Sequence, residues 1–346
     1  MGNARIASIV MLLWPAVTPA GAAEPLTICR IQLTANTNGA SDYDGQIVDC
    51  VGGIVVGKTD TTRPRVFLHD PSCAGRNIDP EHLDAWCGIQ VKDWTWPPEL
   101  YDAVEIGDWV SLTNVLVEEY VGVTFLQYQS SHNPGFTTST GYTLPDPLIV
   151  SVEDIPAPVH DVQLDTWFVE DHAAEPYESL RLIVRDVTIG DMNLGKALDN
   201  YVLEGAGGDR CWAADYMNID KPAWLKYHGF ASPQEHFCAV AGLFEQYTRR
   251  DDGWDYYQLV TLESSGMGIC GDGNVDGQIN TDDLERLAEC LTGQLCAPSG
   301  PPCNPPTWPA PPADLPLAHC MMMDLDYDGD VDLRDFAGLQ IVFSEN

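Results

Sequence analysis

Two stretches near the end of the chain carry oxygen-bearing side chains at matching positions. They read DGNVDGQINTDD (272–283) and DLDYDGDVDLRD (324–335), and each has glycine at its sixth position. Positions one, three, five, nine and twelve are Asp272, Asn274, Asp276, Asn280 and Asp283 in the first loop, and Asp324, Asp326, Asp328, Asp332 and Asp335 in the second. Ca²⁺ is bound by oxygen ligands at this spacing around a sharp glycine turn. The sequence therefore predicts two bound Ca²⁺ ions, with Gln278 and Asp330 at position seven offering backbone carbonyl oxygens.

A helical pattern follows each loop, but none precedes it, and position twelve is Asp instead of the Glu of ordinary EF-hands. With apolar Ile279 and Val331 at position eight, the duplicated unit over residues 270–346 resembles a type I dockerin. That resemblance implies docking to a cohesin or another cell-surface protein. It also implies that positions ten and eleven select the partner. These positions are Thr281, Asp282, Leu333 and Arg334, and because the two pairs differ, symmetric docking in two orientations is not expected.

A long proline-rich segment with several cysteines joins the two loop-helix units. Proline favours extended chain, and we expect disulfides to hold this small unit together where its apolar core is thin. A calcium-stabilised cap that binds no protein partner and a solvated acidic tail are the alternative interpretations.

The body of the chain, residues 26–266, shows short apolar runs bounded by Gly, Pro, Asn and Asp, which is typical of strands. Five runs precede a proline-bounded join near residue 148 and five follow it. Gly52 and Gly53 would let the first strand bend. We expect a mostly β protein with two tandem five-stranded OB-like barrels, residues 26–147 and 148–266, followed by a small α-helical calcium-binding module, residues 270–346. The ten predicted strand runs cover 45–58, 65–70, 87–94, 108–120, 123–129, 179–190, 199–205, 209–216, 237–247 and 254–263.

Several of these sequence segments resemble the tandem OB-fold modules of secreted bacterial nucleases and surface proteins. Those nucleases carry a separate catalytic domain, and we expect none among the segments of this sequence. OB surfaces bind oligonucleotides or oligosaccharides. A net charge of −35, from 17 Lys and Arg against 52 Asp and Glu, disfavours nucleic acid and leaves polysaccharide as the expected ligand. The candidate ligand-binding aromatics are Trp94, Trp96, Tyr101, Trp254 and Tyr256, with burial in the core as the alternative for each.

No nucleophile elbow, zinc helix or phosphate loop is present in the sequence, and the eight histidines are scattered. Acidic residues gather in 169–178, but the sequence gives no reason for a raised pKa there. We therefore expect a non-catalytic binding or presentation protein. A polysaccharide-acting hydrolase with a carboxylate pair, and a structural surface or filament subunit, are the alternatives.

The chain begins with an apolar run and a small-residue site that predict a signal peptide over residues 1–23. Prolines interrupt that run, so we expect no membrane span in the mature chain. All eleven cysteines follow it, which suits a secreted or cell-surface protein. Cys29 with Cys50, Cys73 with Cys87, and Cys211 with Cys238 are candidate pairs from sequence proximity alone.

Overall fold

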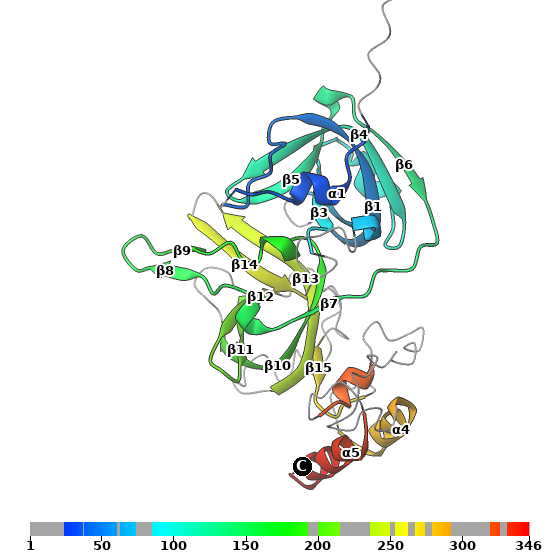
Figure 1. Cartoon of the computed structure of the whole chain (residues 1–346), viewed down its shortest axis with the longest axis vertical. Coiled ribbons are helices and arrows are strands. Elements are labelled where there is room, and N and C mark those ends of the chain that lie inside the picture. The colour runs from blue at the N-terminus through cyan, green and yellow to red at the C-terminus, as the bar shows by residue number, and fades with distance from the viewer. Residues whose placement is uncertain are drawn as a thin grey trace, which may run out of the picture.

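The computed structural model describes residues 24–36, 38–60, 63–73, 85–192, 200–214, 236–249, 253–261, 267–273, 279–291, 319–325 and 331–345. The expected signal peptide lies outside the described residues. So do Asn274, Asp276, Gln278, Asp326, Asp328 and Asp330, the middle positions of the two predicted calcium loops. Figure 1 shows two β units stacked one upon the other, with two helices at the far end.

The first unit is a closed five-stranded barrel of the OB-like kind, and it confirms the expectation of a mostly β chain. Its strands pair in the order β1-β2-β3-β5-β4, and β4 pairs back onto β1. They are β1 (Ile47–Thr59), β2 (Arg65–His69), β3 (Gly88–Asp93), β4 (Trp109–Tyr120) and β5 (Val123–Tyr128), accompanied by α1 (Ile28–Gln32), η1 (Pro71–Cys73), α2 (Glu99–Ala103), η2 (Ser130–His132) and β6 (Gly135–Ser139).

The long first strand closes this barrel because it bends at a glycine pair. Gly52 has a φ of +89°, and a Cβ atom placed there would lie 1.5 Å from the Val110 carbonyl oxygen. The register of β1 against β4 shifts between Cys50 and Gly53. Only glycine combines this backbone angle with so close an approach, so the predicted bend is confirmed.

The second unit repeats the same cyclic order of pairing. Strands pair as β10-β11-β12-β14-β13, and β13 pairs back onto β10. The partners β12 and β14 are parallel, as β3 and β5 are in the first barrel. Its elements are β7 (Leu148–Val150), η3 (Val152–Asp154), β8 (Val159–Asp161), β9 (Thr166–Phe168), η4 (Glu175–Tyr177), β10 (Arg181–Met192), β11 (Asn200–Gly205), β12 (Arg210–Ala214), β13 (His236–Arg249), β14 (Trp254–Val260) and β15 (Met267–Ile269). Each of the ten predicted strand runs therefore contains a strand.

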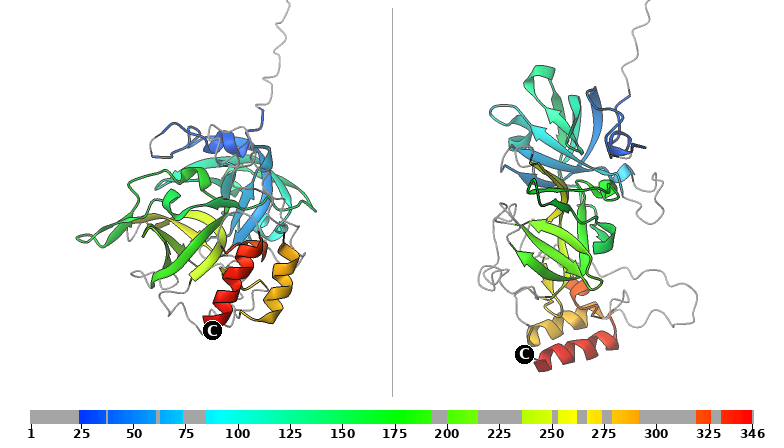
Figure 2. Two further views of the ribbon diagram at one scale, coloured as in Figure 1. Left: turned by 60° about the horizontal axis from the view of Figure 1, so that its bottom comes forward. Right: turned by 90° about the vertical axis from the view of Figure 1, so that its left-hand side faces the viewer.

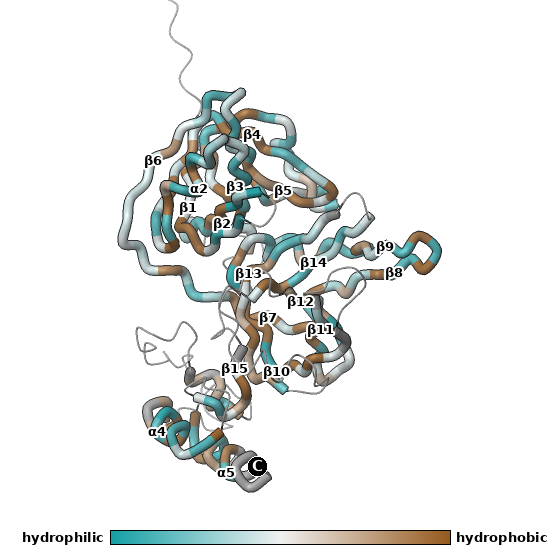
Figure 3. The backbone as a smooth tube through the Cα atoms, turned by 180° about the vertical axis from the view of Figure 1, so that it is seen from behind, coloured by the Kyte–Doolittle hydropathy of each residue, from teal (hydrophilic) through white to brown (hydrophobic). Residues whose placement is uncertain are grey.

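One apolar core runs through both units. Buried residues of the first barrel, such as Leu68 and Ile89, belong to the same hydrophobic cluster as Leu180, Phe244 and Tyr257 of the second. Figure 3 shows the apolar positions recurring along the strands of both units. The ion pair between Arg65 Nη1 and Glu245 Oε2, 2.9 Å apart, also crosses between them. The two units are thus packed directly against each other.

The described elements of the tail are α4 (Thr281–Cys290), η6 (His319–Met322) and α5 (Leu333–Glu345), and Figure 2 shows the two α-helices side by side. They enclose a small apolar core that includes Leu287, Met323, Val331 and Leu339. This core is separate from that of the barrels, in agreement with the thin core expected from sequence.

Within the described part of the chain, two disulfides hold the tail, and both differ from the pairs suggested by sequence proximity. Cys238 of β13 bonds to Cys270, and Cys290 at the end of α4 bonds to Cys320. The suggestion of Cys211 with Cys238 is therefore wrong: β13 runs beside β15, and this pairing brings Cys238 to Cys270. The other cysteines that the structure describes are buried thiols: Cys29, Cys50, Cys73, Cys87 and Cys211. Among the described residues, no helix is both long and apolar enough to cross a membrane.

Candidate functional sites

The two tail loops are closed by the same pair of hydrogen bonds. In the first loop, Asp283 Oδ1 accepts from the Gly273 backbone N–H at 2.9 Å and Oδ2 from that of Asn280 at 2.7 Å. Asp335 of the second loop accepts from Leu325 at 2.6 Å and from Asp332 at 2.7 Å. In both loops, the carboxylate at position twelve therefore binds the amides of positions two and nine.

Each helix after a loop begins with the side chain at position nine as its cap. Asn280 Oδ1 accepts from the Asp282 N–H at 2.8 Å, and Asp332 Oδ1 accepts from the Arg334 N–H at 2.6 Å. Such caps satisfy backbone donors that have no partner within the helix. The duplication seen in the sequence is thus reproduced, bond for bond, in the described parts of both loops.

The position-one and position-twelve carboxylates lie inside the tail. Asp272, Asp283, Asp324 and Asp335 are all buried. A buried ionised carboxylate requires a compensating cation or several hydrogen bonds. For Asp324, the structure supplies one such partner, because Oδ2 lies 2.8 Å from Nη2 of Arg185 in β10. The second barrel thus places a positive charge on the second loop.

The donor set suits Ca²⁺ at the positions that the structure describes. Asp283 and Asp335 accept hydrogen bonds through both carboxylate oxygens. A carboxylate oxygen has more than one lone pair, so these hydrogen bonds are compatible with a role as cation ligands. No three His, Cys, Asp or Glu side chains among the described residues form a group that could hold a metal ion. The middle ligands at positions three, five and seven lie outside those residues, so two Ca²⁺ ions stay a prediction.

The four residues predicted to select a partner lie on the surface of the tail. Thr281, Asp282, Leu333 and Arg334 are all exposed, and Leu333 has 78% of its surface accessible. They occupy the first turns of α4 and α5. The exposed pair on α5 is a leucine and an arginine, whereas the pair on α4 is a threonine and an aspartate, so the two helix starts differ in chemistry.

Three of the five candidate aromatics gather at one end of the first barrel. Trp94 and Trp96 follow β3, and Tyr101 lies in α2; Trp96 is 94% exposed and Trp94 40%. The Arg63 guanidinium lies 4.2 Å from the ring centre of Trp94, and Lys58 Nζ lies 4.5 Å from that of Tyr101. We call Trp94, Trp96 and Tyr101 the aromatic rim.

The expectation of a second exposed aromatic cluster needs correction. Trp254 is 2% exposed and Tyr256 is fully buried. Both pack in the core of the second barrel, where the Tyr256 ring lies 4.4 Å from that of Trp212 and 6.2 Å from that of Trp254. Burial of these large rings stabilises the barrel, so the core alternative holds for this pair.

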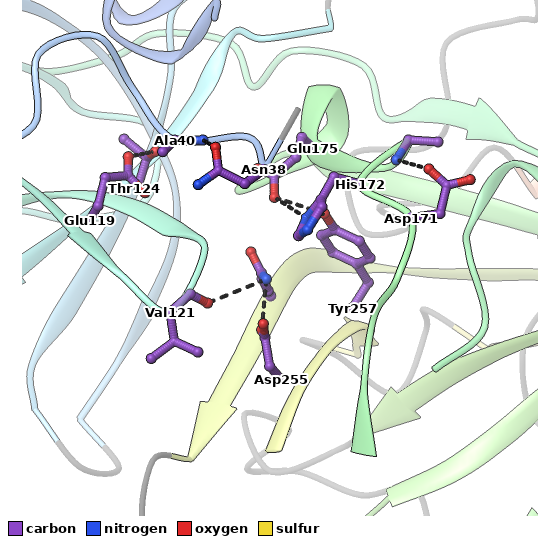
Figure 4. Close-up of polar contacts among 12 residues, drawn as sticks. Asn38, Ala40, Glu119, Val121, Thr124, Asp171, His172, Glu175, Asp255 and Tyr257 are labelled. Carbon is purple, nitrogen blue, oxygen red and sulfur yellow. Dashed lines mark hydrogen bonds and ion pairs between the residues drawn. The ribbon is translucent and has the colours of Figure 1, made fainter. Parts of the chain in front are cut away.

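A cluster of acidic side chains lies where the two barrels meet (Figure 4). Glu175 Oε1 accepts a hydrogen bond from the Tyr257 hydroxyl at 2.7 Å and lies 3.4 Å from His172 Nδ1. Asp255 Oδ1 accepts from Gln246 Nε2 at 2.7 Å. These residues belong to the second barrel, and Glu119 and Val121 of the first barrel face them. We call this set, together with the neighbouring Glu178, the junction cluster.

Burial changes the proton affinity of the junction cluster. It raises the pKa of Glu119 to about 7 and that of Asp255 to about 6. Burial, with repulsion from Glu175, raises the pKa of Glu178 well above its ordinary value. The hydrogen bond to Glu175 raises the pKa of His172. The cluster can therefore hold protons near neutral pH.

Sequence reasoning pointed to part of this cluster without recognising it. The acidic segment 169–178 contains His172, Glu175 and Glu178, but its partners come from β3, β4, β13 and β14. The sequence does not reveal that these elements lie next to one another in the fold. The signal in the sequence is that glutamates stand within predicted strand runs, as in NVLVEEY and AGLFEQY.

Comparisons with known proteins give no family. No protein-family model matches the chain, and no curated protein matches it. Among solved structures, the chain is similar to Schizosaccharomyces pombe Pot1pC bound to single-stranded DNA, at 12% identity over 32% of this chain and 83% of that one, with a TM-score of 0.21. Fission yeast Pot1 with single-stranded DNA matches at 10% identity over 63% and 79%, with a TM-score of 0.26. At these scores, the likenesses carry no argument about the ligand.

Proposed function

We propose that this chain is an exported, non-catalytic modular protein. Its two OB-like barrels bind or present a ligand, and its dockerin-like tail attaches them, in the presence of Ca²⁺, to a cohesin-like or other cell-surface partner. The observation that carries this proposal is the matched closure of the two tail loops by Asp283 and Asp335. Such matching is expected of a duplicated ion-binding loop.

The attachment role is supported by the contrast between buried and exposed residues within the tail. The buried carboxylates at positions one and twelve point to an internal cation, while Thr281, Asp282, Leu333 and Arg334 stay exposed at the helix starts. A cap that served stability alone would gain nothing from an exposed leucine beside the loop. Bound Ca²⁺ would neutralise the loops and fix the two helix starts.

The ligand proposed for the barrels is an uncharged polysaccharide. Trp96 offers an almost fully exposed ring beside Trp94, and rings of this kind stack against sugars. Asp60, Glu99, Asp102 and Glu105 lie around the same end of the barrel. Together with the net charge of −35, these acids disfavour a polyanion.

Hydrolysis of the polysaccharide receives less support. Glycoside hydrolysis needs two carboxyl groups that both reach the sugar, whereas Glu175 and Glu178 of the junction cluster are 5% and 1% exposed. Turnover assays on a panel of polysaccharides test this choice. Release of reducing sugar by the purified chain, abolished by Glu119→Gln, would favour the hydrolase.

The attachment proposal is tested by partner capture with the full chain. We expect cohesin-like modules immobilised on a surface to retain the wild-type chain in Ca²⁺ and to release it in chelator. Leu333→Gln should weaken capture without changing Ca²⁺ binding, because it alters an exposed contact residue, adds no charge and removes no ligand. Asp102→Ala, an exposed change in the first barrel, serves as the control. Ca²⁺ binding without capture by any such module would leave the cap interpretation.

A further inference from the structure

The barrel junction brings carboxyl groups together in greater number than the cations beside them. From the first barrel come Asp44, Arg65, Lys92, Glu118 and Glu119, and from the second come His172, Glu175, Glu178, Glu245 and Asp255. One cation is already committed, because Arg65 is ion-paired with Glu245 at 2.9 Å. Lys92 is the remaining cation beside Glu178 among these groups. The junction therefore holds unbalanced negative charge whenever its acids are ionised.

Glu178 is the most enclosed of these acids. It is 1% exposed, and neither of its carboxylate oxygens has a hydrogen-bond partner in the described part of the chain. Its backbone is fixed on both sides, because its N–H donates to the Glu175 carbonyl at 3.0 Å and the next N–H donates to Phe244 at 2.8 Å. Gly88 of the first barrel packs closely against its carbonyl oxygen. The side chain thus has no route to solvent without movement of the barrels.

Glu119 of β4 approaches the same junction from the first barrel. Its Oε1 accepts hydrogen bonds from the Ser41 backbone N–H at 2.9 Å and from the Thr124 hydroxyl, and its Oε2 has no partner among the described residues. Gly39, in the loop that carries Ser41, lies directly against the Glu175 side chain of the second barrel. The two glutamates therefore face the same interface from opposite sides.

We propose that the junction between the barrels is a proton-operated joint, by which we mean that protonation of its carboxyl groups controls how tightly the two barrels pack against each other. With Glu178 and Glu119 protonated, the apolar contacts around them hold the barrels together. When both are ionised, their repulsion with Glu175 and Glu245, and the cost of burying unpaired charge, loosen the junction. The inference concerns the body of the chain and does not depend on the proposed attachment by the tail.

The direction of the pH effect follows from the shifts. An acid with a raised pKa in the folded state leaves the protein most stable below its ordinary pKa and less stable as pH rises. For Glu119 the loss spans pH 4.5 to about 7, and for Asp255 it spans 3.8 to about 6. Protonated His172, held by Glu175, adds a loss in the same direction as pH rises past 6.5. Burial lowers the pKa of Lys92 to about 8, so its contribution is nearly constant in acid.

Hydrogen–deuterium exchange of the full chain tests the joint. Protection factors, corrected for intrinsic exchange, are measured at pH 5 and pH 8 for peptides covering 118–125 and 172–180. We expect about a tenfold or greater loss of protection at pH 8 in the wild type, equivalent to one pKa unit of linkage. Glu178→Gln and Glu119→Gln, which cannot ionise, should each keep more protection at pH 8. Exposed Glu170→Gln, on the same barrel, should behave as the wild type.

Two results would overturn the proposal. One is equal protection of the wild-type junction at both pH values. The other is a loss of protection in Glu178→Gln and Glu119→Gln as large as in the wild type. If Glu178→Gln fails to unfold cooperatively, the Glu119→Gln comparison decides the matter, because that side chain is only partly buried.

Discussion

Arg185 of the second barrel donates to Asp324 of the tail, with 2.8 Å between Nη2 and Oδ2. The aspartate is fully buried and occupies position one of the second predicted calcium loop. A guanidinium at this point neutralises one carboxylate of the loop in the absence of metal. It also links the tail to β10 across 139 residues of sequence. Arg185 thus sets the charge around position one of the second loop.

Arg185→Gln should affect the two loops unequally. Without calcium, we expect a loss of tail stability of about 3 kcal/mol, because a buried carboxylate loses its charged partner. With calcium, removal of the nearby positive charge should tighten binding at one of the two sites. Chelator-dependent proteolysis and Ca²⁺ titration of the full chain measure these effects. An equal change at both sites would contradict the role given to Arg185, and Arg30→Gln, an exposed change in the first barrel, is the control.

The two disulfides should have separable effects. Cys238→Ala with Cys270→Ala removes the bond between β13 and the start of the first loop, and we expect the tail to be lost to protease while the barrels survive. For loops of this length, the expected cost is about 3–4 kcal/mol. Cys290→Ala with Cys320→Ala should instead destabilise the packing within the tail. Mass mapping of the protected fragments distinguishes these outcomes; identical fragments from both variants would be inconsistent with the assignment.

The tryptophans should divide into surface and core. Trp96→Ala should change the free energy of unfolding by less than about 0.5 kcal/mol, because the ring is exposed. Trp254→Ala should cost about 3–5 kcal/mol, because it leaves a cavity in the second barrel. Urea unfolding measures both. If the aromatic rim binds sugar, Trp96→Ala should also abolish retention on the polysaccharide that the wild type binds; unchanged retention would remove the rim from the proposed function.

Gly52→Ala tests how the first barrel closes. The φ of +89° and the contact with the Val110 carbonyl leave no space for a methyl group, so we expect a loss above about 2 kcal/mol. Gly45→Ala is a matched control, since its φ is +75° but nothing lies within 4 Å of a Cβ there. Thermal unfolding compares them. If both variants lost the same small amount of stability, the close contact between Gly52 and the Val110 carbonyl would not be needed for barrel closure.

The strands could be predicted because their signal is local. Alternating and continuous apolar runs such as 237–247 and 254–263 contain the strands β13 and β14, and Gly52 marked the bend in β1. The position of the tail helices likewise followed from the apolar spacing after each loop, as in α4. These features depend on residues within one turn or one strand of each other.

The remaining features depend on contacts between distant elements. Sequence proximity makes Cys211 a candidate partner of Cys238, because the sequence shows only separation along the chain. In the structure, β13 pairs with β15, and this pairing brings Cys270 beside Cys238. The junction cluster could not be predicted, because Glu119 and Glu178 meet only after both barrels have formed. Burial of Tyr256 follows from the face of β14 that points inward, which an aromatic-rich strand does not reveal.

Calcium titration of the full chain tests the central claim most directly. The chain is first treated with chelator, and calorimetry is recorded together with circular dichroism. The account predicts two ions bound per chain, with loss of both in Asp272→Ala combined with Asp324→Ala and no loss in Asp102→Ala. The absence of binding by the wild-type chain would contradict it, and would leave two packed β barrels with a disulfide-held tail of some other purpose.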